Sequence, residues 1–179
     1  VNSPYNYKKL IKPFLGEPIA EDGTINNEYF NINKKGEDAT NTTRGINEAL
    51  KYAQNHNISY LKLEKGIYLI DGIGNIYQEK GIIISSNITF DLNSSTLKHV
   101  KNDQIRYTVI SVYNVQNVTI MNGIIEGDKV EHNYNNINST HEWGYAIEVC
   151  SSKNIKLTNL EIKNTTGDGI IITQQNGEN

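Results

Sequence analysis

The sequence predicts an all-β chain: a right-handed parallel β-helix, which is a solenoid, with a capping α-helix at its N-terminal end. Three observations lead to this fold class. Residues 36–71 hold one helical apolar stripe and then change to a period of two. Three later segments repeat a pattern of a polar residue, Asn and alternating side chains. No proline follows Pro18, and proline is excluded from paired strands because it cannot donate to a ladder.

The first 35 residues differ from the rest. All three prolines of the chain lie there, and no apolar periodicity is sustained. We expect residues 1–35 to form an extended lead-in, with a strand near Glu28–Ile32. Residues 36–179 would then be the β-helix, incomplete at its C-terminal end because no second cap is predicted near Gln174–Asn179.

A short amphipathic helix is predicted over Thr43–Gln54. Ile46, Leu50 and Ala53 fall on one face of it, at the spacing of a buried helical stripe. Two strands follow, Tyr60–Leu63 and Ile67–Ile70, bent at the intervening glycine. The helix is expected to cover the open end of the tube, with every later strand stacked behind it.

The repeats predict three short strands for each turn of the tube. Asn87, Asn117 and Asn154 occupy the same place in the three repeats, and asparagine suits corners because it tolerates left-handed backbone. We therefore expect them to stack, with the strands parallel. The alternative is an antiparallel β-sandwich, which explains neither the single helix nor the asparagine register. The expected strands are 81–84, 86–90, 95–100, 108–112, 116–120, 123–125, 145–150, 153–157, 160–162 and 169–173.

Composition excludes several classes of function. The net charge is −3, so the sequence lacks the basic footprint of a nucleic-acid-binding protein. No apolar run reaches the roughly 20 residues of a membrane span. Cys150 is the single cysteine, which excludes an internal disulfide framework and a multi-cysteine zinc site. His132 and His141 match no metal-ligand spacing, so we expect neither a metal nor a cofactor.

Two stretches resemble a known family. Gly36–Ala53 followed by Tyr60–Asp71 is similar to the N-terminal entry of the pectate-lyase-like superfamily, which includes many bacteriophage tail spikes and appendages. Asn164–Ile170 resembles the coil motif of that superfamily that ends in Gly-Asp-Gly-Ile. The resemblance implies a β-helix that binds a cell-surface polysaccharide and forms a homotrimer or attaches to other virion proteins. It also implies a place in a virion tail or outside the cell.

The resemblance specifies activity less than fold. The Arg-x-Pro-x-x-Arg pattern of calcium-dependent pectate lyases is absent, since no proline follows Pro18. The acidic cluster of polygalacturonases is matched by one carboxylate, Asp168, whose alternative role is that of a corner residue.

The stretch Glu126–Glu148 holds most of the candidate catalytic and sugar-binding residues. It is the longest insertion between predicted strands and holds the single tryptophan. Asp128, Glu142 and Asp168 are the candidate catalytic carboxylates of a polysaccharide hydrolase or lyase, since glycoside hydrolysis needs two carboxyl groups beside the bond. The candidates that would assist them are His141 for proton transfer and Trp143 and Tyr145 for stacking on sugar rings.

The alternative for this insertion is a solvated loop in which Trp143 is a packing anchor. Two functions stay open as a result. One is a phage tail spike or appendage that binds and cleaves a bacterial polysaccharide, and the other is a non-catalytic structural or adhesive protein of a virion or cell surface.

Overall fold

A computed structural model describes residues 15–175 of the chain. Its elements, in chain order, are α2 (Asn27–Phe30), α3 (Ala39–Asn55), β1 (Tyr60–Lys62), β2 (Ile67–Ile70), the 3₁₀ helix η2 (Ile76–Gln78), β3 (Ile82–Ile83), β4 (Ile88–His99), β5 (Arg106–Tyr113), β6 (Gln116–Glu126), β7 (Trp143–Cys150), β8 (Lys153–Lys163) and β9 (Ile170–Thr173).

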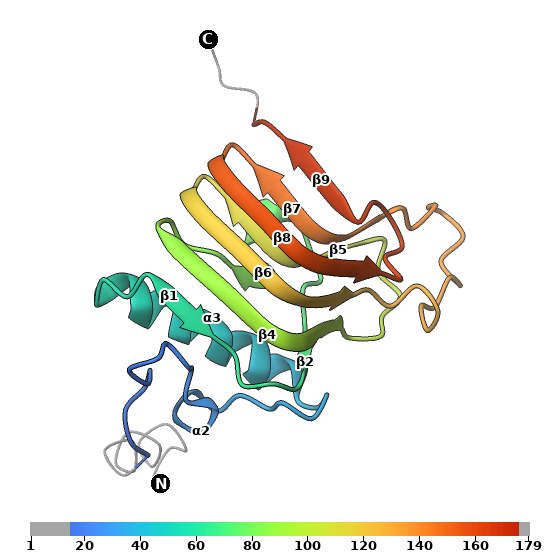
Figure 1. Ribbon diagram of the computed structural model, residues 1–179. Helices are drawn as coiled ribbons and strands as arrows, with labels where there is room; N and C mark the ends of the chain where they lie inside the picture. The colour runs from blue at the N-terminus through green and yellow to red at the C-terminus, as the bar shows by residue number, and fades with distance from the viewer. Residues whose placement is uncertain (1–14, 176–179) are drawn as a thin grey trace, which may run out of the picture.

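The strands form two parallel sheets (Figure 1). One has the order β1-β4-β6-β8, with β2 also paired to β4, and the other has the order β3-β5-β7-β9. Consecutive strands of the chain from β3 onward alternate between the sheets, so each parallel pair is joined by a crossover through the other sheet. The core lies between them and includes Phe90, Leu97, Val109, Ile120 and Ile147, none of which is exposed.

The predicted fold class, an all-β solenoid of three short strands per turn, is wrong. The described residues form an α/β arrangement of two parallel sheets with few helices. Runs predicted as separate strands, such as 86–90 and 95–100, continue as one long strand, β4. The reason is local: Asn93 and Ser94 adopt left-handed backbone conformations, so the strand bends there with a shift of register and stays in its sheet.

The predicted parallel register is confirmed. Asn87, Asn117 and Asn154 all have positive φ angles between 54° and 59°. The Asn117 side chain donates to the Asn87 Oδ1 over 2.9 Å, and that of Asn154 donates to the Asn117 Oδ1 over 2.7 Å. The pairs β4–β6 and β6–β8 are parallel, which excludes the antiparallel sandwich.

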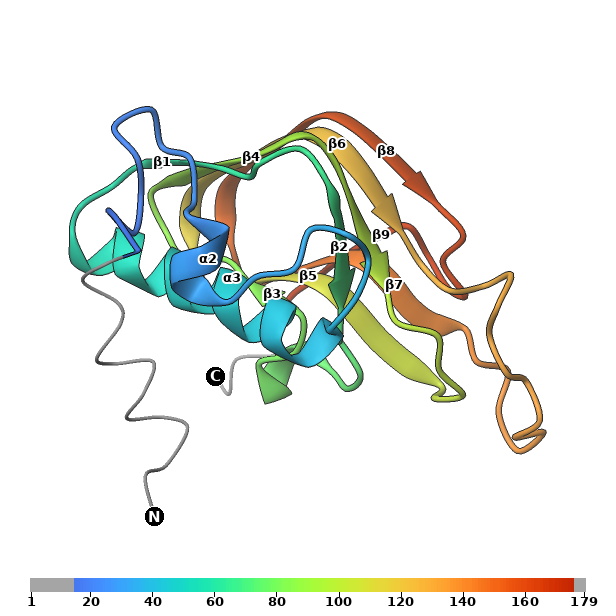
Figure 2. The same ribbon diagram turned by 90° about the horizontal axis from the view of Figure 1, so that it is seen from below.

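The predicted helix is present and is longer than expected. It begins at Ala39 because the Asp38 side chain caps it by accepting from the Asn41 N–H. The stripe of Ile46, Leu50 and Ala53 is buried, as predicted. Figure 2 shows α3 lying across one end of the two sheets, where it contacts β2 and β3.

The prediction for the lead-in is wrong in one respect. Where a strand near Glu28–Ile32 was expected, the chain forms α2, because the Asn26 side chain accepts from the Tyr29 N–H and caps a helical turn. Ile25, Phe30 and Ile32 are buried in the same core as the sheets. Residues 1–14 of the predicted lead-in lie outside the described residues.

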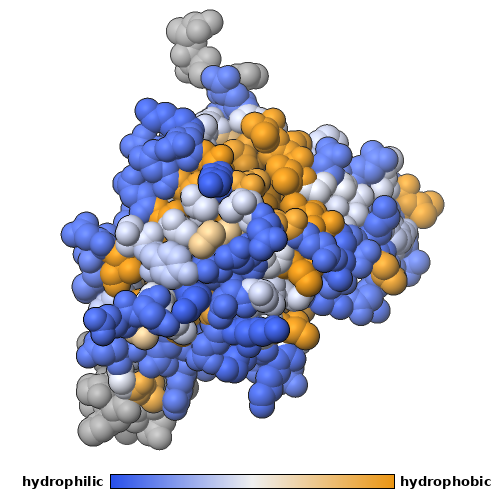
Figure 3. Space-filling model, in the orientation of Figure 1, coloured by the Kyte–Doolittle hydropathy of each residue, from blue (hydrophilic) through white to orange (hydrophobic). Residues whose placement is uncertain are grey.

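The last two strands leave apolar side chains at the surface. Ile170 is 42% exposed and Ile172 is 78% exposed, and four further apolar residues of β8 are only partly buried. Figure 3 shows apolar residues gathered over this part of the molecule. The opposite end of the sheets has α3 packed against it.

Candidate functional site: a sheet-face cluster and a buried histidine relay

A buried carboxylate lies between two strands of the second sheet. Glu148 of β7 is 3% exposed. Its Oε1 accepts from the Arg106 Nη2 over 3.3 Å, and its Oε2 accepts from the Thr108 hydroxyl over 2.8 Å. Arg106 and Thr108 are two residues apart on β5, so their side chains leave the sheet on the same side. The arginine and the hydroxyl thus compensate the loss of water around the carboxylate.

Two aromatic residues extend this group along β7. Trp143 and Tyr145 pair in register with Arg106 and Thr108. The central carbon of the Arg106 guanidinium lies 5.8 Å from the centre of the Trp143 ring and 5.9 Å from that of Tyr145, within cation–π range. Trp143 is 48% exposed, whereas Tyr145 is buried. We call Arg106, Thr108, Trp143, Tyr145 and Glu148 the sheet-face cluster.

Charges of the sheet-face cluster and of Asp168 both shift the pKa of the Tyr145 hydroxyl. Burial raises the pKa of the Tyr145 hydroxyl, the Arg106 charge lowers it, and the charges of Glu148 and Asp168 raise it. Asp168 itself is exposed, in the turn before β9. One cation and two carboxylates therefore act on the same hydroxyl.

Gly144 explains the close packing between the two aromatic residues. It pairs with Tyr107, and a Cβ at this position would collide with the Tyr107 ring and with the Thr166 hydroxyl. The glycine between Trp143 and Tyr145 is therefore required for β7 to lie against Tyr107, with the two aromatic neighbours on the opposite face of the sheet.

The segment that includes η2 borders the same face of the sheet. The Tyr77 hydroxyl lies 3.9 Å from the Cys150 Sγ, and the Tyr77 ring packs edge-on against Tyr113. The Ser111 hydroxyl donates to the Lys80 carbonyl over 2.7 Å. Cys150 is buried, but it lies outside the main core cluster.

A second polar cluster lies at the base of the insertion between β6 and β7. The Asp128 Oδ2 accepts from the Asn102 N–H over 2.9 Å and from the Asn102 side chain over 2.8 Å. The same oxygen lies 2.8 Å from the His132 Nδ1. The His132 Nε2 lies 2.7 Å from the His141 Nδ1, and the His141 Nε2 lies 2.8 Å from the Asn136 carbonyl oxygen. We call Asp128, His132 and His141 the buried relay.

His99 and Tyr107 lie under the relay, with their rings stacked 4.0 Å apart. The His99 Nε2 accepts from the Gly72 N–H over 3.0 Å, so the proton of the neutral ring is on Nδ1, which donates to the Val100 carbonyl. Burial lowers the pKa of His99. The Tyr107 hydroxyl accepts from the Thr166 N–H over 3.2 Å, which ties the turn before β9 to this region.

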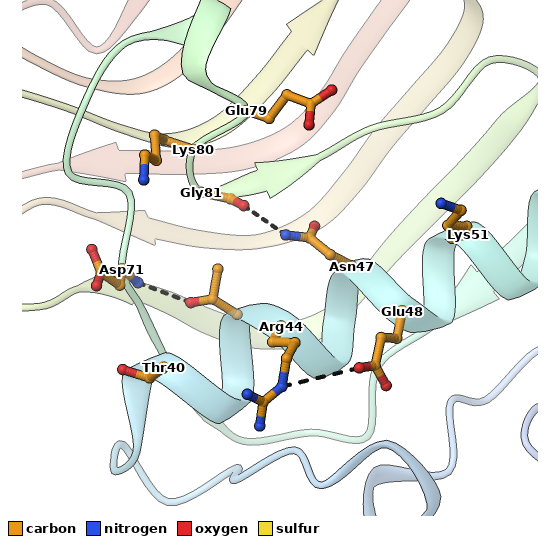
Figure 4. A pocket seen from close by; sticks show the side chains of 10 residues that line it. Thr40, Arg44, Asn47, Glu48, Lys51, Asp71, Glu79, Lys80 and Gly81 are labelled. Atoms are coloured by element: carbon orange, nitrogen blue, oxygen red, sulfur yellow. Dashed lines mark hydrogen bonds and ion pairs between the residues drawn. The ribbon is translucent and has the colours of Figure 1, made fainter. Parts of the chain in front are cut away.

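A separate cleft of about 430 Å³ lies between α3 and residues 79–81 (Figure 4). Much of its polar lining is paired internally. Asn47 donates to the Gly81 carbonyl, the Thr43 hydroxyl accepts from the Asp71 N–H, and Arg44 is 4.0 Å from Glu48. The first two contacts attach the helix to the chain beside the sheets and the third lies within α3, and we assign the cleft no function.

The structure separates the residues that the sequence predicts as a site. Asp128 and His141 come together, through His132, in the buried relay. Trp143 and Tyr145 come together around Arg106. Glu142 is exposed and so is Asp168, whereas the Asp128 side chain is fully buried.

Sequence reasoning missed Arg106 and Glu148, and it considered His132 as a metal ligand only. Glu148 carried a signal, since it is the one charged residue in the apolar run Tyr145–Cys150. Arg106 had no such signal. Within the described residues, no group of three or more His, Cys, Asp or Glu side chains is arranged to hold a metal ion.

The two-sheet parallel fold occurs in a solved structure described as a "putative glycosyl hydrolase" from Parabacteroides merdae. The TM-score is 0.64 at 17% identity, and the match covers 82% of this chain and 67% of that one. At this identity the likeness shows the fold alone. It agrees with the two-sheet α/β description and corrects the predicted solenoid.

Two curated relatives come from Bacillus subtilis. The "SPbeta prophage-derived uncharacterized protein YorA" is 34% identical over 154 residues, which are 81% of this chain and 26% of that protein. The "Uncharacterized protein YclG" is 31% identical over 157 residues, 83% of this chain and again 26% of the relative. The chain thus spans about a quarter of the length of these relatives. No family model matches the sequence.

None of the helices in the described part of the chain is long and apolar enough to cross a membrane.

Proposed function

We propose that this chain binds a polysaccharide of the bacterial cell surface across the sheet-face cluster. The observation that supports the proposal is Trp143, a half-exposed aromatic ring that lies beside a guanidinium at the first residue of β7. An aromatic face in water favours flat apolar partners, such as the C–H face of a sugar ring. Arg106 lies next to that face and supplies donors for the hydroxyl groups of the same sugar.

Cleavage of the polysaccharide is the second candidate function. The observation that favours it is a shielded carboxyl, Glu148, and an exposed one, Asp168, both acting on the Tyr145 hydroxyl. Glycosidases use two carboxyl groups in unlike environments, one as the acid and the other as the base or nucleophile. Glu142, exposed next to Trp143, is the alternative second carboxyl.

The setting of this activity is also a proposal. The printed name of YorA places that relative in a prophage, which supports a phage origin for this chain too. A place in a virion tail or outside the cell, as a homotrimer or attached to other virion proteins, would bring the cluster to a polysaccharide surface. In the non-catalytic alternative the same surface is adhesive only.

Retention on immobilised cell-wall and capsular polysaccharides tests binding. Trp143→Ala should weaken retention about tenfold or more, since loss of one aromatic platform is worth on the order of 1–3 kcal/mol. Ile137→Ala is the matched control, because Ile137 is 90% exposed in the same insertion but lies outside the cluster. Equal retention of Trp143→Ala and wild type on every glycan that binds would overturn the proposal.

Release of reducing ends, assayed on the same preparations, tests cleavage. Asp168→Asn and Glu148→Gln should each abolish release, and Asp168→Asn should retain binding, because Asp168 is exposed and outside the Arg106 pair. Release that survives both changes removes these two residues from the reaction. If wild type releases nothing from any glycan that it binds, the adhesive function replaces cleavage.

A further inference from the structure

The buried relay needs more protons than two neutral histidines can supply. It contains three consecutive contacts of 2.7–2.8 Å: Asp128 to His132, His132 to His141, and His141 to the Asn136 carbonyl. Each hydrogen bond requires one proton between its two atoms. A neutral imidazole carries one proton, so two neutral rings supply two protons for three bonds. One further proton must be present when all three bonds are made.

The carboxylate is not the holder of that proton. The Asp128 Oδ2 already accepts from the Asn102 N–H and from the Asn102 side chain, as an ionised carboxylate does. The Asp128 Oδ1 is buried and has no hydrogen-bond partner in the described structure, so a proton placed there would have no acceptor. The third proton therefore belongs to the two imidazoles, which share one positive charge opposite one negative charge.

The relay is fully shielded from solvent at its acidic end. The side chains of Asp128 and His132 are both 0% exposed, and His141 as a residue is 1% exposed. Without the third proton, one of the three contacts brings two lone pairs together at less than 3 Å in a dry site, which is a costly arrangement. The protonated relay is therefore the form that matches the observed distances.

The titratable and charged groups that face the relay come from several elements. The rings of Tyr134 and His132 are 4.6 Å apart, and the Tyr107 hydroxyl lies 3.4 Å from the Asp128 N–H. The remaining groups are His99, Lys98 and Glu126 from the β4 and β6 strands and Lys101 and Glu131 from the adjoining loops. Of these groups, Lys98 and Glu131 form an ion pair with each other at 2.8 Å.

The relay is positioned to control the end of the insertion. His132 and His141 both belong to the segment that leads from β6 to β7, and His141 lies directly before Glu142 and Trp143. His141 also adopts a left-handed backbone conformation, with φ 57°, which few residues other than glycine adopt. The hydrogen bonds of His141 hold that conformation and so fix where Trp143 enters the sheet.

We propose that the buried relay is a proton-dependent latch that holds the insertion closed and positions Trp143. With the third proton, the three bonds fix residues 128–141. As the pH rises and the proton is withdrawn, one bond is lost, the insertion opens, and the Trp143 ring leaves its place beside Arg106. Asp128, His132 and His141 are positioning residues in this scheme.

The single tryptophan of the sequence makes the latch directly measurable. The fluorescence emission of Trp143 should change in one transition as the pH is raised and the relay loses its third proton. The ¹⁵N signals of the imidazoles should show one positive charge shared by His132 and His141 below that transition and none above it. The lowered pKa of His99 keeps its own titration on the acid side.

One variant separates a latch from a merely structural contact. The amide of Gln offers both a donor and an acceptor, so His141→Gln can bond to His132 whether or not its facing nitrogen is protonated. We expect folded His141→Gln to show Trp143 emission that no longer depends on pH. His56→Gln is the control, since His56 is exposed at the end of α3, and its profile should equal that of wild type.

Two results would overturn the latch. One is a Trp143 fluorescence emission that stays constant with pH while the ¹⁵N signals of His132 and His141 show that their shared positive charge is lost. The other is a His141→Gln profile identical to that of wild type. If His141→Gln does not fold, the imidazole and emission titrations of wild type decide alone. Only the further expectation that polysaccharide binding weakens through the same transition rests on the proposed function, so its failure with an intact latch would count against that function.

Discussion

Two of the buried carboxylates in the described part of the chain, Glu148 and Asp128, have their charges compensated in different ways. Glu148 lies within a strand, and its partners Arg106 and Thr108 come from the neighbouring strand, 42 and 40 residues away in the sequence. Asp128 lies in an insertion, and its partner His132 is four residues away. The first carboxylate is compensated by a cation that stays protonated at every accessible pH, and the second, in the proposed latch, by the proton that His132 and His141 share.

The difference shows what each environment can do. The backbone hydrogen bonds between β5 and β7 hold their side chains in fixed register. The pair of Glu148 and Arg106 is therefore already in place before a ligand binds. The insertion has no ladder along most of its length and is held by a few contacts, among them those of the buried relay and of Asn102, so a change of one proton in the relay can change the conformation of the segment. One carboxylate therefore suits binding or catalysis, and the other suits control.

The largest effect is expected from removing the carboxylate of the relay. Asp128→Ala should lower the free energy of unfolding by about 3–5 kcal/mol, since it leaves a buried charge and buried donors without a partner. Urea unfolding of the two proteins measures it. Asp103→Ala is the control, because Asp103 is exposed nearby and should change stability by less than about 0.5 kcal/mol. A cost for Asp128→Ala as small as that of the control would show that the relay is not formed.

Removing the charge of the other carboxylate should cost less. Glu148→Gln keeps the shape of the side chain and an acceptor for Thr108, and Arg106 is one-third exposed, so water can solvate its charge. We expect a loss of about 1–2 kcal/mol. A double-mutant cycle with Arg106→Gln should give a coupling of at least about 0.5 kcal/mol between the two positions. Strict additivity would mean that the contact of 3.3 Å contributes nothing in solution.

Local periodicity predicted much of this structure from the sequence. The stripe of Ile46, Leu50 and Ala53 and the recurring Asn87, Asn117 and Asn154 have physical causes that act within a few residues. The fold class failed because the bend at Asn93 and Ser94 allows one strand to continue where the pattern suggests two. Whether a left-handed residue ends a strand or only bends it depends on hydrogen bonds from the neighbouring strands.

The candidate site was predictable only in part, for a related reason. Trp143 and Tyr145 stand out by residue type, but Arg106, which pairs in register with Trp143, lies 37 residues earlier in the sequence, before the insertion. Asp128 and His141 were selected as separate catalytic groups because nothing in the sequence shows that His132 joins them. Burial of Asp128, which separates it from Glu142 and Asp168, is a property of the folded insertion alone.

The smallest expected effect is a slope of stability against pH, and it comes from His99, which lies beneath the relay. Burial lowers the pKa of His99 in the folded protein, whereas the unfolded chain has the ordinary value near 6.5. Below about pH 6.5 the unfolded chain therefore binds more protons than the folded one, and stability falls as the pH decreases. Above that value His99 is neutral in both states and adds no slope.

A titration of stability in wild type and His99→Gln isolates this contribution. Gln can accept from the Gly72 N–H and donate to the Val100 carbonyl as the neutral ring does, and it does not titrate. The difference between the two proteins should be flat above about pH 6.5 and should change by at most about 1.4 kcal/mol per pH unit below it. A difference that instead changes only at alkaline pH would place the proton of this region on His99 and not on His132 and His141.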